Sequence, residues 1–117
     1  MLALCAGCDS GVLWQDEPYQ VNWLDTGSNR SLAYALGNGN SIGRVESEVI
    51  AVGSNDSYVV AKQRSRNGKI VSYFYIDRKK DDKFYNGSEI TKGPFNYKEY
   101  SEISNELNLP NFTEAFD

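Results

Sequence analysis

The chain contains no histidine, and this absence removes the commonest catalytic base. Its 117 residues include only two cysteines, three prolines and one methionine. Without histidine there is no Ser-His-Asp or Cys-His arrangement, and the side chain that titrates nearest neutral pH is missing. Two cysteines cannot complete a structural zinc site, which normally has four Cys or His ligands. We therefore expect no enzymatic activity, no metal and no cofactor.

A long apolar run is also missing. No segment approaches the length of about 18 apolar residues at which a membrane-spanning helix becomes a candidate. Charged residues make up 24% of the chain, and the mean hydropathy is −0.54. The formal net charge is −4, and an acidic chain lacks the extended basic surface that nucleic-acid binding requires. We expect a single water-soluble domain that has no nucleic-acid partner.

A short apolar run stands at the start of the chain, where residues 2–8 read Leu-Ala-Leu-Cys-Ala-Gly-Cys. The small residues Ala6 and Gly7 precede Cys8, as a processing peptidase requires beside the bond that it cuts. The segment resembles the end of a bacterial lipoprotein signal, in which such a cysteine carries the lipid. Secretory signals open with positive charge and about 7–15 apolar residues, and no Lys or Arg precedes Cys8.

We interpret residues 1–8 as the remnant of a signal within which Met1 is an internal methionine. Cys8 is then the lipidated residue, and the protein is anchored to a membrane of the cell envelope, facing the periplasm or the exterior. Two lipid chains or more are needed for stable anchoring. If Met1 is the natural start, the alternative location is the cytoplasm.

Cys5 and Cys8 also form a Cys-x-x-Cys pair, which opens two alternatives. A thiol redox pair needs a strand before it and a helix after it to lower the thiol pKa. Asp9-Ser10-Gly11 is a poor helix opening. The other alternative is an N-terminal strand in which the two cysteines merely pack.

The chain beyond the signal divides into a tether and one domain. Residues 9–18 are polar and end at Pro18, which predicts a tether, and residues 19–117 are expected to form the domain. Alternating apolar and polar residues predict strands over 19–23 and 31–36 with a turn at 25–29. Residues 45–52 predict a third strand.

Asn67-Gly68 predicts a hairpin of residues 58–65 and 69–77, because a type I′ turn needs positive φ at both central residues. That turn places Lys62 opposite Tyr73 and Val59 opposite Ile76. One face of the hairpin is then free of charge and is expected to be core; it carries Val59, Ala61, Ile70, Phe74 and Ile76. The other face carries Val60, Lys62, Arg64, Val71, Tyr73 and Tyr75.

The second face of the hairpin mixes tyrosines with long cations, a composition enriched at protein interfaces. We take Lys62, Arg64, Tyr73 and Tyr75 as a candidate partner-binding surface. The alternative is a solvated sheet on which tyrosines and cations cover one another. A basic block over residues 62–80 could attract an anionic partner or keep the edge of the hairpin in water.

One helix is predicted near the C-terminus. Asn96 is a good N-cap and Glu99 stands three residues later, as in a capping box. Tyr100, Ile103 and Leu107 form a narrow apolar stripe, and Pro110 ends the helix. Leu109, Phe112 and Phe116 are expected to fold back onto the body. The predicted fold class is α+β, a mainly antiparallel sheet of about five strands with this helix packed on it.

Two pairs of carboxylates remain as candidate acid–base groups. Glu46 and Glu48 lie in a predicted strand, and Asp81 and Asp82 lie in a loop. A glycosidase uses such a pair, but a solvated surface is the simpler interpretation of both.

Three motifs carry a family resemblance over residues 45–110. They are the Ala61-Lys62-Gln63 strand, the strand Tyr73-Phe74-Tyr75-Ile76-Asp77, and Gly93-Pro94-Phe95 before a short helix that is followed by Leu109-Pro110. The chain resembles small bacterial lipoproteins of a domain-of-unknown-function family. This resemblance implies a lipid anchor and no known activity.

The leading functional hypothesis is a non-enzymatic, envelope-anchored binding protein. An immunity or inhibitor protein that blocks a toxin or a hydrolase would suit a compact, acidic chain without catalytic groups. The alternatives are a general envelope lipoprotein with a structural role and a thiol redox protein that uses Cys5 and Cys8.

Overall fold

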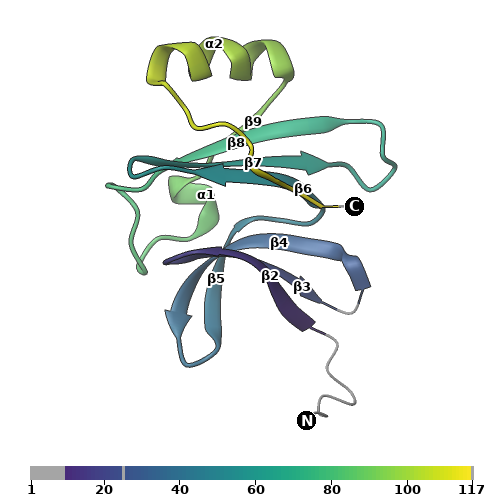
Figure 1. Cartoon of the computed structure of the whole chain (residues 1–117), viewed down its shortest axis with the longest axis vertical. Coiled ribbons are helices and arrows are strands. Elements are labelled where there is room, and N and C mark those ends of the chain that lie inside the picture. The colour runs from purple at the N-terminus through teal and green to yellow at the C-terminus, as the bar shows by residue number, and fades with distance from the viewer. Residues whose placement is uncertain (1–9, 25, 117) are drawn as a thin grey trace.

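The structure is a computed structural model that describes residues 10–24 and 26–116. Within these residues the chain forms a four-stranded and a five-stranded antiparallel sheet, stacked with α2 on the outer side of the larger sheet (Figure 1). The elements are β2 (Ser10–Asp16), β3 (Tyr19–Leu24), β4 (Thr26–Gly37), β5 (Asn40–Val45), β6 (Val49–Ser54), β7 (Tyr58–Arg64), β8 (Val71–Asp77), α1 (Gly87–Ile90), β9 (Lys92–Phe95), α2 (Tyr97–Leu107) and β10 (Glu114–Ala115). The predicted α+β class is confirmed, with the strands divided between two sheets.

The four-stranded sheet is a meander in the order β2-β3-β4-β5. The prediction of a tether over residues 9–18 is wrong for most of that segment, because β2 pairs with β3 from Ser10 to Asp16. The strand signal there is the short apolar run Val12-Leu13-Trp14, which polar residues flank on both sides. The turn predicted at 25–29 is also shorter than expected, because β4 begins at Thr26.

The five-stranded sheet has the order β10-β6-β7-β8-β9. The register of its central hairpin is confirmed, with Lys62 opposite Tyr73 and Val59 opposite Ile76. The prediction of a type I′ turn is wrong, because Gly68 has a φ of 76° but Asn67 does not have a positive φ. The turn closes instead with the Gly68 N–H donating to the Ser65 carbonyl at 2.8 Å. Pro94 is accommodated because β9 is an edge strand, where a missing N–H costs no ladder bond. The C-terminal segment returns to the opposite edge and adds β10 to β6.

Two boundary predictions need correction. Residues 45–52 are not one strand, because β5 ends at Val45 and β6 begins at Val49, and these two strands belong to different sheets. Ile70, predicted as core, is 62% exposed. It precedes the first residue of β8 and so lies beyond the edge of the packed sheet.

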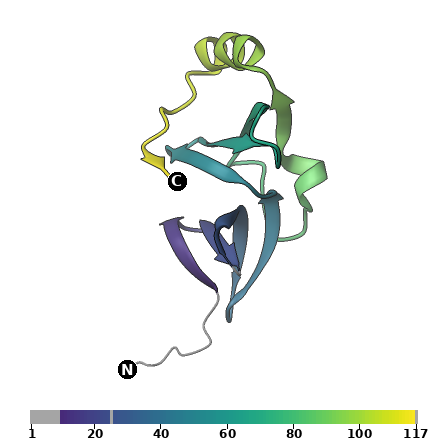
Figure 2. The same cartoon turned by 90° about the vertical axis from the view of Figure 1, so that its right-hand side faces the viewer.

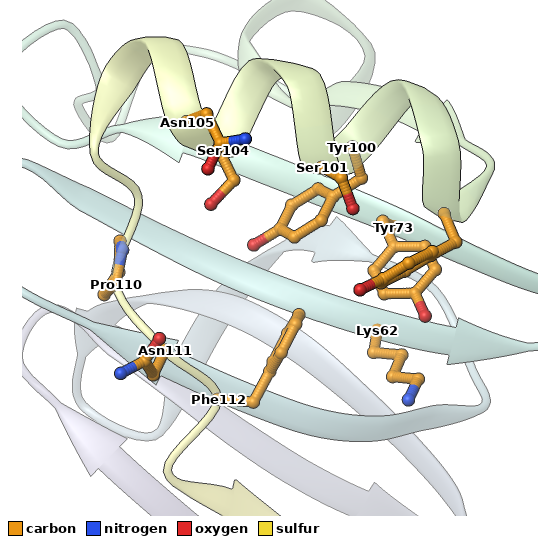
Figure 3. A pocket seen from close by; sticks show the side chains of 10 residues that line it. Lys62, Tyr73, Tyr100, Ser101, Ser104, Asn105, Pro110, Asn111 and Phe112 are labelled. Carbon is orange, nitrogen blue, oxygen red and sulfur yellow. The ribbon is translucent and has the colours of Figure 1, made fainter.

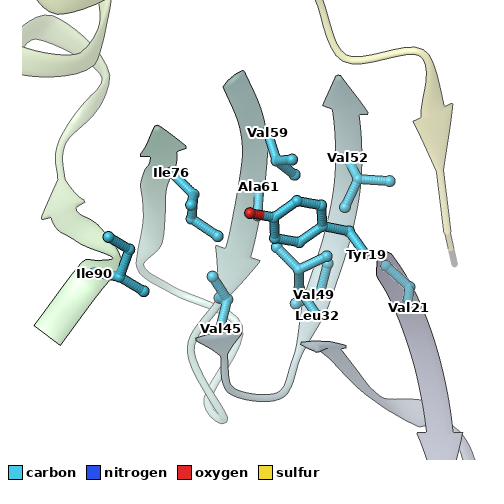
Figure 4. Packing of buried hydrophobic residues seen from close by; sticks show 10 residues of the cluster. All are labelled: Tyr19, Val21, Leu32, Val45, Val49, Val52, Val59, Ala61, Ile76 and Ile90. Atoms are coloured by element: carbon cyan, nitrogen blue, oxygen red, sulfur yellow. The ribbon is translucent and has the colours of Figure 1, made fainter. Parts of the chain in front are cut away.

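The space between the two sheets is filled by aliphatic side chains, which we call the inter-sheet core. Figure 4 shows the ring of Tyr19 from β3 among valines of the larger sheet. The most buried members, all less than 2% exposed, are Tyr19, Val21, Leu32, Val49, Val52, Val59 and Ile76. Each fully buried side chain of this size contributes roughly 1.5–3 kcal/mol, so this core is the main reason that the sheets stay together.

Arg44 and Asp81 form a buried ion pair beside the inter-sheet core. The guanidinium donates from Nε to Oδ2 at 2.9 Å and from Nη2 to Oδ1 at 2.8 Å, and both side chains are 0% exposed. The Tyr19 hydroxyl donates to the same carboxylate at 2.8 Å. The interpretation of Asp81 as a solvated surface group is therefore wrong: it joins the loop after β8 to β3 and β5.

Glu48 makes a second connection between the sheets. Its Oε2 accepts from Nη2 of Arg30 in β4 and from Nη2 of Arg64 in β7, each at 3.0 Å. Arg30 also donates from Nε to the carbonyl of Val49 at 2.9 Å. This carboxylate is engaged in structural pairing, which removes it as a free acid–base group.

The predicted helix is present as α2, and its capping box is confirmed. The Asn96 side chain accepts from the Glu99 N–H at 2.8 Å, while the Glu99 carboxylate accepts from the Asn96 N–H at 2.9 Å. The helix ends at Leu107, and Asn108 follows in the left-handed conformation with φ of 56°. A second, shorter helix, α1, uses the same kind of cap at Asn86 and Glu89, and the sequence analysis missed it.

Candidate functional site

A groove of about 430 Å³ lies between α2 and the C-terminal segment, on the outer side of the five-stranded sheet (Figure 3). Its floor is made by side chains of β7 and β8 together with rings from α2 and from Phe112. One wall is the Ser101, Ser104 and Asn105 face of α2, and the other is the run from Pro110 to Phe112. We call this the helix groove.

The floor of the helix groove is a cluster of four aromatic rings. Tyr73 and Tyr100 stack with ring centroids 4.8 Å apart, and Tyr97 and Phe112 lie 5.7 Å and 6.2 Å from the Tyr73 ring. Tyr73 is 8% exposed, whereas Tyr97 is 67% exposed. The cluster therefore runs from a buried base to an open rim, as in a ligand site that offers both packing and access.

The C-terminal segment passes close to the backbone of β6, and this contact positions the second wall of the helix groove. A Cβ placed on Gly53 would lie 1.9 Å from the carbonyl oxygen of Asn111, so only glycine lets the C-terminal segment cross β6 at this point. Leu109 is 8% exposed and Phe112 packs in the same cluster, which confirms that these residues fold back onto the body. Phe116 packs against the inter-sheet core, also as predicted.

The Tyr100 hydroxyl is an unsatisfied polar atom at the base of the groove. Tyr100 is 6% exposed, and its hydroxyl has no hydrogen-bond partner within the described part of the chain. Burial raises the pKa of Tyr100 to about 12, and the nearby Tyr73 acts in the same direction. A buried polar group without a partner costs about 1–3 kcal/mol, so a ligand that supplies a partner would recover that free energy.

Among the residues that the structure describes, Lys62 is the only charged one that lines the groove. Its Nζ lies 5.6 Å from the centroid of the Tyr73 ring, and no ion pair involving Lys62 forms within residues 10–24 and 26–116. A cation over an aromatic face with no carboxylate nearby can accept an anionic group from a ligand.

The four residues of the predicted partner-binding surface do not form one site in the structure. Lys62 and Tyr73 lie together in the helix groove. Arg64 instead pairs with Glu48 at 3.0 Å. Tyr75 stacks on Phe95 with centroids 6.2 Å apart, and burial raises the pKa of its hydroxyl. These four residues share one face of the hairpin, but α2 and β9 cover different parts of it.

The sequence analysis missed four groove residues with small polar side chains: Ser101, Ser104, Asn105 and Asn111. Asn105 lies outside the apolar stripe predicted for α2, and the helical pattern shows which face is apolar but not which segment returns to cover the edge of that face. The one signal for these residues in the sequence is Pro110. A chain that reverses direction at Pro110 runs alongside the preceding helix, so residues after it can face α2.

The residues that carry the lipoprotein and redox hypotheses, Cys5 and Cys8, lie outside the described residues. No helix in the described ranges has the length and apolarity needed to cross a membrane. Across the same ranges, no group of three or more His, Cys, Asp or Glu side chains is placed to hold a metal ion.

No family model matches this chain, and the comparisons with curated proteins and with solved structures found no match. The resemblance to bacterial lipoproteins of unknown function therefore stays a prediction, and the helix groove has to be interpreted from its own chemistry.

Proposed function

We propose that the protein is a non-enzymatic binding protein whose helix groove takes an extended segment of a protein partner. The single observation that carries this proposal is the combination of an aromatic floor, an unsatisfied Tyr100 hydroxyl and an unpaired Lys62 ammonium in one groove. Aromatic residues supply most of the contact energy at protein interfaces. A peptide offers carbonyl groups for the hydroxyl and a carboxylate for the ammonium.

The partner of this proposal is a toxin or a hydrolase that the protein blocks, as an immunity or inhibitor protein does. A blocker needs a preformed surface and no reaction chemistry of its own. The absence of histidine from the chain supports a role without catalysis. The stacked contact of Tyr73 with Tyr100 supports a rigid floor, because a preorganised site loses less conformational entropy when it binds.

The proposed location is the outer side of a cell membrane, with the lipid carried on Cys8. The described domain begins at Ser10, in β2, so an anchor on Cys8 would hold the four-stranded sheet near the membrane. Figure 1 places α2 at the opposite end of the molecule from the N-terminal strand. The helix groove would then face away from the membrane, toward an incoming partner.

Site-specific photo-crosslinking in the native host tests the groove. A photoreactive residue at Asn105, which lines the groove, is compared with one at Asp56, in the exposed turn between β6 and β7. We expect one protein adduct from position 105 and none from position 56, and a Lys62→Glu change should reduce that adduct. Equal labelling from both positions, or no adduct from position 105, overturns the proposal.

Two further measurements separate the proposed function from its alternatives. The intact mass of the protein from its native host should correspond to a chain that begins at Cys8 and carries acyl groups. Cells that lack the gene should be sensitive to the crosslinked partner and otherwise normal. An envelope defect without any such partner would favour the structural lipoprotein instead.

A further inference from the structure

A second hollow lies on the face of the four-stranded sheet that is turned away from the inter-sheet core. Its volume is about 510 Å³, and all four strands β2 to β5 contribute to its lining. Figures 1 and 2 show the five-stranded sheet and both helices on the other side of this sheet. We call the hollow the sheet cleft; it shares no lining residue with the helix groove.

Among residues 10–24 and 26–116, no charged residue lines the sheet cleft. Its polar groups are amides and hydroxyls, which both donate and accept hydrogen bonds. They come from Gln20, Asn22, Asn29, Ser31 and Ser41, and Trp23 adds an indole. The strand register places Asn22 directly opposite Ser31, so their side chains leave the sheet on the same face.

Small residues keep the cleft open. Ala33 and Gly43 are paired across β4 and β5, and both line the cleft. The sheet therefore presents backbone and short side chains at its centre, with amides, the Trp23 ring and the exposed apolar side chains of Val12 and Leu24 around them. A flat, polar ligand can approach the backbone closely over such a surface.

Asn22 carries an unsatisfied acceptor in this cleft. Its Oδ1 atom is buried and has no hydrogen-bond partner among the described residues. Buried side-chain oxygens in folded proteins almost always have a partner, so a donor that enters the cleft would complete an otherwise costly arrangement.

We propose that the sheet cleft binds a neutral oligosaccharide. Sugar hydroxyls donate and accept, which matches the amide and hydroxyl lining and supplies the donor that Asn22 lacks. A charged peptide segment would bury its charge without a counter-charge, and a purely apolar partner would leave the amides unpaired. The volume lies within the range of about 300–1,000 Å³ that small-ligand sites occupy.

The proposal is tested with the full chain and a defined set of tetrasaccharides. Calorimetric titration compares β-1,4-glucose, α-1,4-glucose and N-acetylglucosamine tetramers with a galacturonate tetramer as the acidic control. We expect at least one neutral tetramer to bind and the acidic one not to bind. Binding of no neutral tetramer, or equal binding of the acidic one, overturns the proposal.

Variants locate the binding. Asn22→Ala removes the unsatisfied oxygen and should weaken the binding by about tenfold, while Ser41→Trp, at an exposed position of an edge strand, should fill the cleft and abolish it. Tyr97→Ala in the helix groove is the matched control and should leave saccharide binding unchanged. Binding that survives both cleft variants contradicts the proposal. So does a dimer of the unliganded protein that Ser41→Trp disperses, because a second copy would then occupy the cleft.

Discussion

The two cores of this protein differ in how completely their polar groups are satisfied. In the inter-sheet core, the buried carboxylate of Asp81 accepts from Arg44 and Tyr19 through three hydrogen bonds. In the aromatic core under α2, the Tyr100 hydroxyl is also buried and has no hydrogen-bond partner in the described part of the chain. The first arrangement stabilises the fold, and its hydrogen-bonding groups are already engaged within the protein. The second keeps unused hydrogen-bonding capacity beside an open groove.

The difference follows from the elements that build each core. Two sheets cover the inter-sheet core over its whole width, so every polar group that enters it needs an internal partner. A single helix covers the aromatic core, and a helix is too narrow to close a sheet face by itself. The C-terminal segment covers part of the remainder, and the helix groove is what is left between them.

Breaking the Arg44–Asp81 pair should produce the largest loss of stability. Arg44→Met leaves the Asp81 carboxylate buried with only Tyr19 as a donor, and removal of one partner from a buried pair costs about 3–5 kcal/mol. Urea unfolding of the purified protein measures this loss. The control is Arg64→Met, whose pair with Glu48 is partly exposed and should be worth about 1 kcal/mol or less. Similar losses in both variants would contradict the comparison.

High pH should weaken both cores through their tyrosines. An unfolded tyrosine has a pKa near 10, while burial raises the pKa of Tyr100 to about 12 and raises that of Tyr19 further still. Below pH 10 both states keep these protons and the stability is fully present. Above it the unfolded chain loses protons that the folded protein keeps, so the unfolding free energy falls as pH rises.

The expected fall by pH 12 is about 2 kcal/mol from Tyr100 alone. Urea unfolding at a series of pH values measures it, with the Tyr100→Phe variant as the reference. A stability that stays constant across this range would show that neither hydroxyl is as buried as the structure places it.

Removing one hydroxyl from each core compares them directly. Tyr19→Phe loses a hydrogen bond to a charged acceptor and should destabilise the protein by about 1.5–3 kcal/mol. Tyr100→Phe loses no hydrogen bond and removes an unsatisfied group, so it should be neutral or slightly stabilising. The same two unfolding curves test both statements. A destabilised Tyr100→Phe protein would mean that the hydroxyl has a partner after all.

The smallest expected change in stability comes from removing the N-cap of α2. Asn96→Ala removes the side chain that caps the Glu99 N–H and should cost about 1 kcal/mol. Asn105→Ala, on the same helix, replaces a groove residue with a better helix former and should raise stability by a few tenths of a kcal/mol. Thermal unfolding distinguishes the two, and equal effects would indicate that the cap contributes little to holding the helix over its core.

Local chemistry made several elements predictable. Asn67-Gly68 marks its hairpin because Gly68 accepts at little cost the positive φ that the turn requires there, and one turn sets the register of both strands. Asn96 and Glu99 determine the start of α2 because their side chains satisfy each other's backbone N–H groups. These signals act within a few residues, so they persist in the isolated sequence.

The candidate site was only partly predictable. Lys62 and Tyr73 share a face by register, and both line the helix groove. Tyr75 and Arg64 share the same face but contact β9 and Glu48 instead. Which part of a sheet face is covered depends on where distant segments return, and no periodicity within the strand records that.

By itself, the sequence determined the position of the hairpin turn, the helix cap, the hairpin register and the absence of imidazole chemistry, because each depends on residue types or on neighbours within a short stretch of chain. Only the tertiary structure decided that β5 and β6 belong to different sheets, that Asp81 is buried against Arg44, and that Tyr100 and Asn22 each keep an oxygen without a hydrogen-bond partner among the described residues. Those outcomes depend on contacts between residues far apart in the chain, and the burial that makes a polar atom costly exists only once those contacts have formed.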